Sequence, residues 1–176
     1  MPYYKALRSW AVFKGELRKA IHQLKYRRNV ALGQALAVPI INQLRELNWP
    51  LEIVTPVPLG LARLAERGYN QASLLAMPIA LHFKLSFQMQ VIKRCRETQS
   101  QVGLSFASRI ENVAGAFVAD RSKIRGKRIL VVDDVITSGA TMNACAMALY
   151  EAGADEVYGF SLARAGLIDS SGSGDV

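Results

Sequence analysis

Hydrophobic positions along this chain follow two spacings, one typical of amphipathic helices and the other typical of buried strands. Leu17, Ile21 and Leu24 recur at helical intervals, with lysines and arginines between them. Residues 129–132 instead form a continuous apolar run, which is typical of a strand covered on both faces. The chain therefore combines helices that have one buried side with strands that are buried completely.

Extended along the whole chain, the pattern predicts strands that alternate with helices. Strands are expected at residues 10–13, 51–55, 86–93, 115–119, 127–132 and 157–162. Helices are expected from residue 15 onward and at 30–47, 70–82, 106–113 and 141–152, with a loop over 97–105. Such alternation favours an α/β fold, a parallel sheet with helices on both faces. Ligands of these sheets bind beyond the carboxyl ends of the strands.

Length and composition narrow the class of protein. The 176 residues are 51% hydrophobic and 20% charged, which excludes a disordered or fibrous chain. We expect one domain over residues 1–168 and a flexible tail over 169–176. The most apolar stretch, 29–44, is interrupted by polar residues and a proline, and the N-terminus lacks the apolar core of a secretory signal. A soluble cytoplasmic protein without membrane insertion is expected.

Charge is concentrated in the first 50 residues, which hold nine Lys and Arg but only two Glu, in a chain of net charge +8. Such a segment can bind nucleic acid or another polyanion, or it can simply be a solvated helix surface. Lys25, Arg27 and Arg28 are its densest cluster. Aromatic side chains that could stack on bases are Tyr3, Tyr4, Trp10, Phe13 and Tyr26, of which Trp10 and Phe13 are expected to be core residues.

The two cysteines and two histidines give no sign of a metal site or a disulfide framework. Cys145 lies in an apolar helical stretch and is expected to be a small core residue. Cys95 is flanked by basic residues, which can lower the pKa of a thiol, but no candidate base accompanies it. We therefore expect neither cysteine to be catalytic and no zinc to be bound.

The most informative stretch is 129–141, where a buried strand is followed by two acids and a short polar turn that opens a helix. Backbone N–H groups at a helix start can bind a phosphate monoester. The residues expected to do so are Thr137, Ser138, Gly139, Ala140 and Thr141. Asp133 and Asp134 would be repelled by a phosphate, so they are expected to accept hydrogen bonds from sugar hydroxyls. The two acids point to opposite sides if the strand continues, whereas a turn would bring both toward one ligand.

Residues 129–141 resemble the 5-phosphoribosyl-1-diphosphate (PRPP) motif of type I phosphoribosyltransferases. The chain from about residue 12 to 163 resembles the ComF/GntX family, competence-associated proteins of phosphoribosyltransferase type. The stretches that carry this resemblance are 21–26, 55–59, 66–71, 96–101 and 109–117. It implies a three-layer type I phosphoribosyltransferase-like fold with a small hood built from the termini. Many family members begin with a cysteine-rich, zinc-ribbon-like module that this sequence lacks, so the chain is naturally short or truncated.

The resemblance also implies roles for individual residues. The turn Val57, Pro58 and Leu59, with Arg67 nearby, corresponds to the pyrophosphate-binding turn. The loop 97–105 corresponds to a mobile lid, and the residues at or near its borders that could reach the diphosphate are Arg96, Gln101 and Arg109. Asp133 and Asp134 correspond to the catalytic acids, and Mg²⁺ is expected to bind together with PRPP rather than directly to protein side chains.

Two functions follow from the resemblance. The first is an enzyme that transfers ribose 5-phosphate from Mg²⁺-PRPP to an unidentified acceptor and releases pyrophosphate, with a link to DNA uptake. The second is a non-catalytic module that senses PRPP or binds single-stranded DNA, with a competence helicase as a candidate partner. A homodimer is also compatible with the family.

Overall fold

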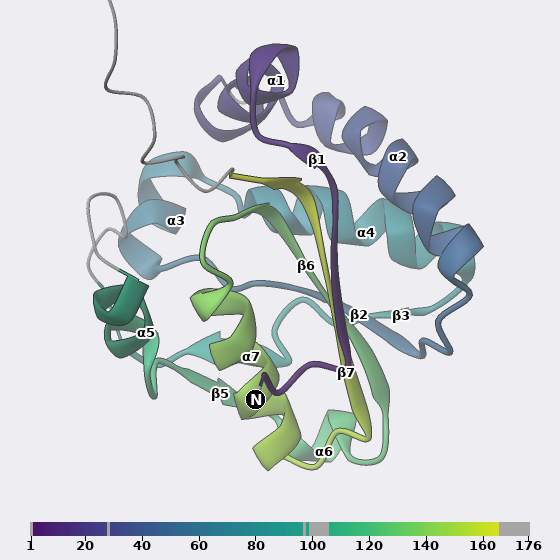
Figure 1. Ribbon diagram of the computed structural model, residues 1–176, viewed down its shortest axis with the longest axis vertical. Helices are drawn as coiled ribbons and strands as arrows, with labels where there is room; N and C mark the ends of the chain where they lie inside the picture. Colours follow the sequence, from purple (N-terminus) through teal and green to yellow (C-terminus); the bar gives the residue numbers. More distant parts are fainter. Residues whose placement is uncertain (1, 28, 97, 99–105, 166–176) are drawn as a thin grey trace, which may run out of the picture.

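The computed structural model describes residues 2–27, 29–96, 98 and 106–165 (Figure 1). Its centre is a five-stranded parallel sheet in the order β1-β7-β6-β2-β3. The strands are β1 (Ala6–Val12), β2 (Ile53–Pro56), β3 (Ser86–Phe87), β6 (Arg128–Ile136) and β7 (Glu156–Arg164). The predicted α/β fold with a parallel central sheet is confirmed.

Helices cover both faces of the sheet. One face carries α1 (Gly15–Tyr26), α2 (Ala31–Leu47) and α4 (Gln71–Phe83), and the other carries α7 (Ala140–Glu151). A two-stranded antiparallel sheet of β4 (Ile92–Arg94) and β5 (Phe117–Ala119) lies on the α7 side, with α5 (Phe106–Val113) beside it (Figure 1). The short helices α3 (Leu61–Arg67) and α6 (Arg121–Ile124) complete the fold.

The apolar run of β6 fills both cores, as its continuous pattern predicts. Ile129 and Val131 are fully buried in the core beneath α7, whereas Leu130 and Val132 are fully buried in the core beneath α2 and α4. Successive side chains of a strand point to opposite faces, so only a strand with helices on both sides needs four apolar residues in succession.

Several element boundaries differ from the prediction. The strand expected to end at 132 continues to Ile136, because Asp133, Val135 and Ile136 keep their pairing with β7. The strand expected over 86–93 is two strands, β3 in the main sheet and β4 in the small sheet. The sequence pattern does not predict α3 or α6, which have seven and four residues and are too short to show a helical repeat.

The N-terminal segment differs most from expectation. The strand expected at 10–13 begins at Ala6 instead, and as β1 it joins the edge of the central sheet and pairs with β7, so the N-terminal part of the expected hood also contributes to the sheet. Trp10 on this strand is 44% exposed, so its prediction as a core residue is wrong, whereas Phe13 is partly buried against the core. The predicted tail, 169–176, lies outside the described residues, and among those described no helix is long and apolar enough to cross a membrane.

Candidate functional site

The two segments predicted to bind phosphate groups follow neighbouring strands of the sheet. β2 and β6 pair in parallel, and the Val57 N–H donates to the Val132 carbonyl over 2.9 Å. The turn after β2 and the turn after β6 therefore lie together at the carboxyl edge of the sheet. This is where ligands of open α/β sheets bind.

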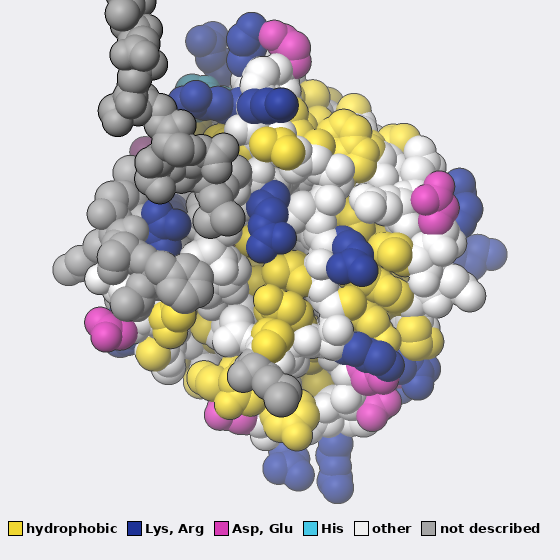
Figure 2. All heavy atoms as spheres, viewed as in Figure 1, with side chains coloured by type: hydrophobic (Ala, Val, Ile, Leu, Met, Phe, Trp, Pro, Cys, Tyr) yellow, Lys and Arg dark blue, Asp and Glu magenta, His cyan; other side chains and the backbone are white. Residues whose placement is uncertain are grey.

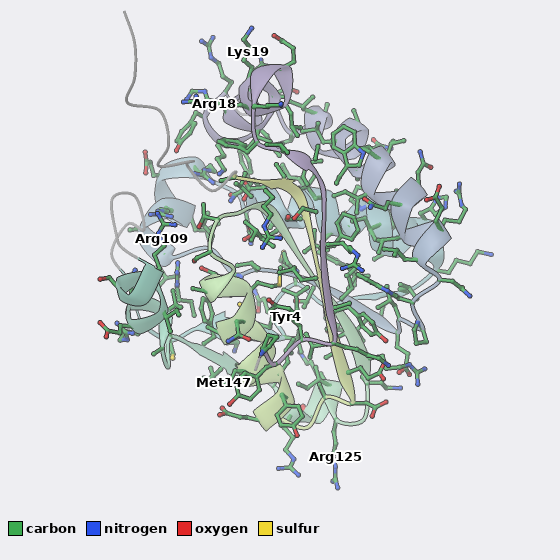
Figure 3. The ribbon with its side chains drawn as sticks, in the orientation of Figure 1. Tyr4, Arg18, Lys19, Arg109, Arg125 and Met147 are labelled. Carbon is green, nitrogen blue, oxygen red and sulfur yellow. The ribbon has the colours of Figure 1, made fainter. Side chains whose placement is uncertain are left out.

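The turn after β6 has the backbone geometry of an anion-binding loop. Gly139 is the N-cap of α7 and has a φ of +80°, a conformation that favours glycine over other residues. The Ser138 hydroxyl accepts a hydrogen bond from the Ala140 N–H over 3.3 Å. Thr137 is exposed beside them. Tyr4, labelled in Figure 3, brings its hydroxyl to 4.0 Å from where a Cβ on Gly139 would stand, so the N-terminal segment borders this turn.

Asp133 and Asp134 are consecutive residues of β6, and the strand continues through both of them, so the alternative in which a turn begins at the acids is wrong. Their side chains nevertheless lie close enough to interact with each other. Asp134 is 3% exposed and accepts a hydrogen bond from Gln71 Nε2 on α4 over 3.2 Å. Asp133 is partly buried, and its Oδ1 accepts from the Asp134 N–H over 2.8 Å.

A lysine of the N-terminal helix completes the surroundings of Asp134. Lys25 Nζ on α1 lies 2.6 Å from Asp134 Oδ2, and the two side chains are 23% and 4% exposed. The sequence pattern groups Lys25 with Arg27 and Arg28 as a basic cluster of a nucleic-acid surface. That interpretation is wrong for Lys25, because its ammonium group is turned inward onto the acid pair.

The two acids have opposite electrostatics. Burial, and then the neighbouring Asp134 carboxylate, raise the pKa of Asp133 well above its usual value. Burial also opposes ionisation of Asp134, but the Lys25 ammonium and the Gln71 amide lower its pKa below the usual value. A neighbouring cation stabilises the charged form of a carboxyl group and lowers its pKa, whereas a neighbouring carboxylate disfavours the charged form and raises the pKa. The pKa values of the two neighbouring carboxyl groups are therefore displaced in opposite directions.

Arg67 belongs to the same network. It is the last residue of α3, and its Nη1 donates to Gln71 Oε1, while the Gln71 amide nitrogen donates to Asp134. The Arg67 guanidinium also stacks over the Tyr26 ring at 5.3 Å from its centre. The predicted arginine thus lies near the acids, connected to Asp134 through one glutamine.

The turn after β2 is only partly available to an anion. The Val57 N–H is used by the sheet, the Val57 carbonyl accepts from Asn70 Nδ2 over 2.9 Å, and Pro58 has no N–H. Val57 therefore has no free N–H to offer an anion. An anion at this turn would bind through the N–H groups of Leu59 and Gly60.

The three residues predicted to border the lid are placed differently in the structure. The Arg96 guanidinium donates to the carbonyls of Asn112 and Ala114, at 3.1 and 2.8 Å, and so caps the end of α5. Arg109 extends from α5 (Figure 3), and its buried Nε has no hydrogen-bond partner among the described residues. Gln101 and most of the 97–105 loop lie outside the described residues.

Sequence reasoning assigns no role in the site to Lys25 or Gln71, although both lie in stretches that carry the family resemblance. A signal for Lys25 is present: it lies four residues after Ile21 and one after Leu24, both fully buried. Residues four apart share a helix face, so the lysine occupies the buried side of α1. A lysine at such a position needs a buried acid as partner. Gln71 offers no comparable signal.

The cysteines and histidines form no centre in the part of the chain that is described. No three His, Cys, Asp or Glu side chains among those residues gather closely enough to hold a metal ion. Cys145 is buried in the core beneath α7, as predicted, and burial raises the pKa of its thiol. Cys95 is exposed.

The outward side of α1 is basic. Its exposed residues surround an open hollow of about 650 Å³, and the residues lining it are Gly15, Arg18, Lys19, His22, Gln23 and Arg27. Figure 2 shows Lys and Arg side chains gathered at this end of the molecule, and Figure 3 labels Arg18 and Lys19 there. One helix thus presents Lys25 to the acid pair and a basic surface to solvent.

Comparison with known proteins connects this site to a family. Residues 69–165 match the model of the phosphoribosyl transferase domain. Competence protein F of Haemophilus influenzae is 36% identical over 132 residues, which are 74% of this chain and 57% of that protein. DNA utilization protein YhgH of Salmonella typhi is 32% identical over 168 residues, 93% of this chain and 74% of that protein.

A solved structure is similar as well. The glutamine PRPP amidotransferase from B. subtilis, complexed with ADP and GMP, aligns with 78% of this chain and 26% of its own at 25% identity and a TM-score of 0.48. The chain spans little more than half of the Haemophilus protein.

Proposed function

Because the chain belongs to the ComF family of phosphoribosyltransferase-like proteins, we propose that it binds Mg²⁺-PRPP and transfers the ribose 5-phosphate to an acceptor. The observation that carries the proposal is the position of three features at one edge of the sheet. These are the glycine turn at the start of α7, the acid pair on β6 and the turn after β2. Together they offer donors for a phosphate, acceptors for hydroxyls and donors for a second anion.

The 5′-phosphate would bind at the turn after β6. The backbone N–H groups that begin α7, and the hydroxyls of Thr137 and Ser138, are the donors there. Asp133 and Asp134 would accept hydrogen bonds from the ribose hydroxyls. Two donors already reach Asp134, but an ionised carboxylate has about four acceptor sites, so capacity for a hydroxyl remains.

The diphosphate would lie toward the turn after β2 and toward Arg109. The buried Arg109 Nε, which has no partner among the described residues, is a charged donor that an anion would satisfy. In the transfer, the bond from ribose C1 to the diphosphate oxygen breaks and the diphosphate leaves with the electron pair. The acceptor forms its bond to C1 from the opposite face. The cationic and N–H donors stabilise the leaving charge.

The residues present also fit Mg²⁺ that enters with PRPP. Mg²⁺ takes oxygen ligands, and substrate phosphates commonly supply several of them together with one or two carboxylates. Here the ion would take its oxygen ligands from PRPP and water, so it would need no direct bond to a side chain of the protein. When bound, the ion neutralises charge that develops on the diphosphate.

Calorimetry tests the proposal directly. We expect PRPP to bind the wild-type protein in the presence of Mg²⁺, and the Asp133→Asn/Asp134→Asn variant to lose most of this binding. A matched control is Glu151→Gln/Asp155→Asn, which removes two exposed acids at the other end of α7. Absence of binding to the wild-type protein at millimolar PRPP would overturn the proposal. Release of pyrophosphate on addition of candidate acceptors would then separate an enzyme from a PRPP sensor.

The basic surface of α1 supports a second candidate function, the binding of single-stranded DNA. Arg18, Lys19 and Arg27 are exposed on this surface, and Tyr26 is 60% exposed beside them. Cations along a groove with an exposed aromatic ring suit the phosphates and bases of a single strand. Two relatives are named for competence and for DNA utilization. If the chain binds single-stranded DNA, a competence helicase is its candidate protein partner.

The test uses an oligonucleotide and the variant Arg18→Ala/Lys19→Ala/Arg27→Ala. Affinity is expected to fall steeply with salt in the wild-type protein and to decrease strongly in the variant. The control, Arg121→Ala/Lys123→Ala/Arg125→Ala, removes three exposed cations from α6 and the residue after it. Arg125 lies at the opposite end of the molecule from Arg18 and Lys19 (Figure 3). If both variants lose the same DNA affinity, the effect comes from the lower net charge of the protein and not from the surface of α1, and this candidate function is overturned.

A further inference from the structure

Resting on the proposed function, we infer that Lys25 of the N-terminal helix is a positioning residue of the sugar site, which keeps Asp134 as a charged acceptor for a ribose hydroxyl. The geometry that carries this inference is the 2.6 Å approach of Lys25 Nζ to Asp134 Oδ2, in a pair whose carboxylate is buried and whose lysine is mostly buried. The central motif is therefore incomplete without a residue supplied by α1.

The position of Lys25 is fixed from both sides along the helix. The preceding residue, Leu24, is fully buried, and its carbonyl accepts a hydrogen bond from the Tyr69 hydroxyl. The following residue, Tyr26, carries the Arg67 guanidinium over its ring. Three consecutive residues of α1 thus contact the segment between α3 and α4 or the acid pair, which holds the Lys25 ammonium on Asp134.

The positive charge of Lys25 reduces the repulsion between the acid pair and the anionic ligand. PRPP carries a phosphate and a diphosphate, and adjacent carboxylates on β6 would repel both. Asp133, Lys25 and Gln71 are the polar groups around Asp134, and Lys25 is the cation among them. The Lys25 ammonium offsets part of the negative charge of the acid pair. Asp134 nevertheless stays ionised and can accept a hydrogen bond from a ribose hydroxyl.

A purely mechanical role for Lys25 would give different results from a charge role. Lys25→Gln keeps a hydrogen-bond donor, on a side chain one bond shorter, but removes the positive charge, whereas Lys25→Arg keeps the charge. The control is Lys14→Gln, which changes an exposed lysine at the N-cap of the same helix. Thermal unfolding and circular dichroism establish that each variant is folded.

The measurement is the dissociation constant of Mg²⁺-PRPP from pH 5 to 8.5 by calorimetry. For Lys25→Gln we expect about tenfold weaker binding at the acid end of this range, because loss of the cation raises the pKa of Asp134 and a larger fraction of the group is protonated there, and we expect recovery as the pH rises. Lys25→Arg is expected to bind within a few-fold of the wild-type protein, and Lys14→Gln to match it at every pH.

The outcomes separate this inference from the proposed function. If the wild-type protein binds PRPP and Lys25→Gln binds it with the same affinity and pH profile, the charge role is wrong and the proposed function stands. If Lys25→Gln and Lys25→Arg lose affinity equally at all pH values, Lys25 acts through shape and the inference is overturned. If the wild-type protein does not bind PRPP, the proposed function fails, and the inference fails with it.

Discussion

Gly33 on α2 lies against Leu74 on α4 so closely that a Cβ atom on Gly33 would stand 2.6 Å from Leu74 Cβ and 3.1 Å from the Leu74 carbonyl oxygen. The two helices therefore cross with the glycine at their contact point. Neither obstacle is the far end of a flexible side chain, so the backbones themselves would have to separate to admit a methyl group.

Gly33→Ala is expected to destabilise the protein, although glycine to alanine in a helix usually stabilises it by up to about 1 kcal/mol. Overpacking of this kind costs about 1–3 kcal/mol, and we expect the melting temperature to fall by several degrees. Gln34→Ala, at the exposed neighbouring position, is the control and should stay close to wild type. A Gly33→Ala variant as stable as the wild-type protein would show that the two helices move apart freely.

Stability is expected to depend on pH through Asp133. Because its pKa is raised in the folded protein, the folded state binds a proton that the unfolded chain has lost, and the contribution of this group to stability falls as the pH rises above about 4 toward the raised pKa. Asp133→Asn removes this loss, and its amide oxygen can still accept the Asp134 N–H.

The difference in melting temperature between Asp133→Asn and the wild-type protein should therefore be small near pH 4. It should grow to several degrees in favour of the variant at pH 8. The comparison isolates Asp133 from the exposed acids of the chain, which both proteins share. A constant difference across this range would mean that the pKa of Asp133 is not raised by folding.

The two thiols should react at very different rates. Cys95 is exposed, whereas Cys145 is fully buried and the pKa of its thiol is raised by burial, so it supplies little thiolate to a reagent. In native buffer a thiol reagent should modify Cys95 alone, and both cysteines should react after denaturation. Cys95→Ser, in which native labelling should disappear, assigns the reactive group.

Arg96 is expected to stabilise the end of α5. Its guanidinium donates to two carbonyls there, and cations at a helix C-terminus also interact favourably with the helix dipole. Arg96→Ala should cost about 0.5–1 kcal/mol and speed hydrogen exchange of α5 amides. Lys93→Ala, at an exposed position on β4, should leave that exchange unchanged.

The central strand and the turn after β6 could be predicted from sequence because their signals are local. Four consecutive apolar residues require a strand buried on both faces, and a glycine after two hydroxyl residues marks the start of α7. The interaction between Gln71 and Asp134, 63 positions apart, leaves no such local pattern. The same holds for the Val57 N–H, whose partner is set by strand pairing and not by its neighbours in sequence.

The continuation of β6 through its two acids could not be predicted for a related reason. Charged residues usually mark the end of a buried strand, but Asp134 stays buried because Lys25 and Gln71, from other elements, compensate it. Propensity along the strand contains no information about these partners.

The pairing of the first strand with the last has a consequence for how the chain reaches this structure. Ser9 and Ser161 are 152 positions apart and lie 2.7 Å from each other, hydroxyl to hydroxyl, across β1 and β7. On the ribosome β1 emerges well before β7, the strand with which it pairs. Contacts of such long sequence separation form slowly, so β1 should be the last strand to join the sheet.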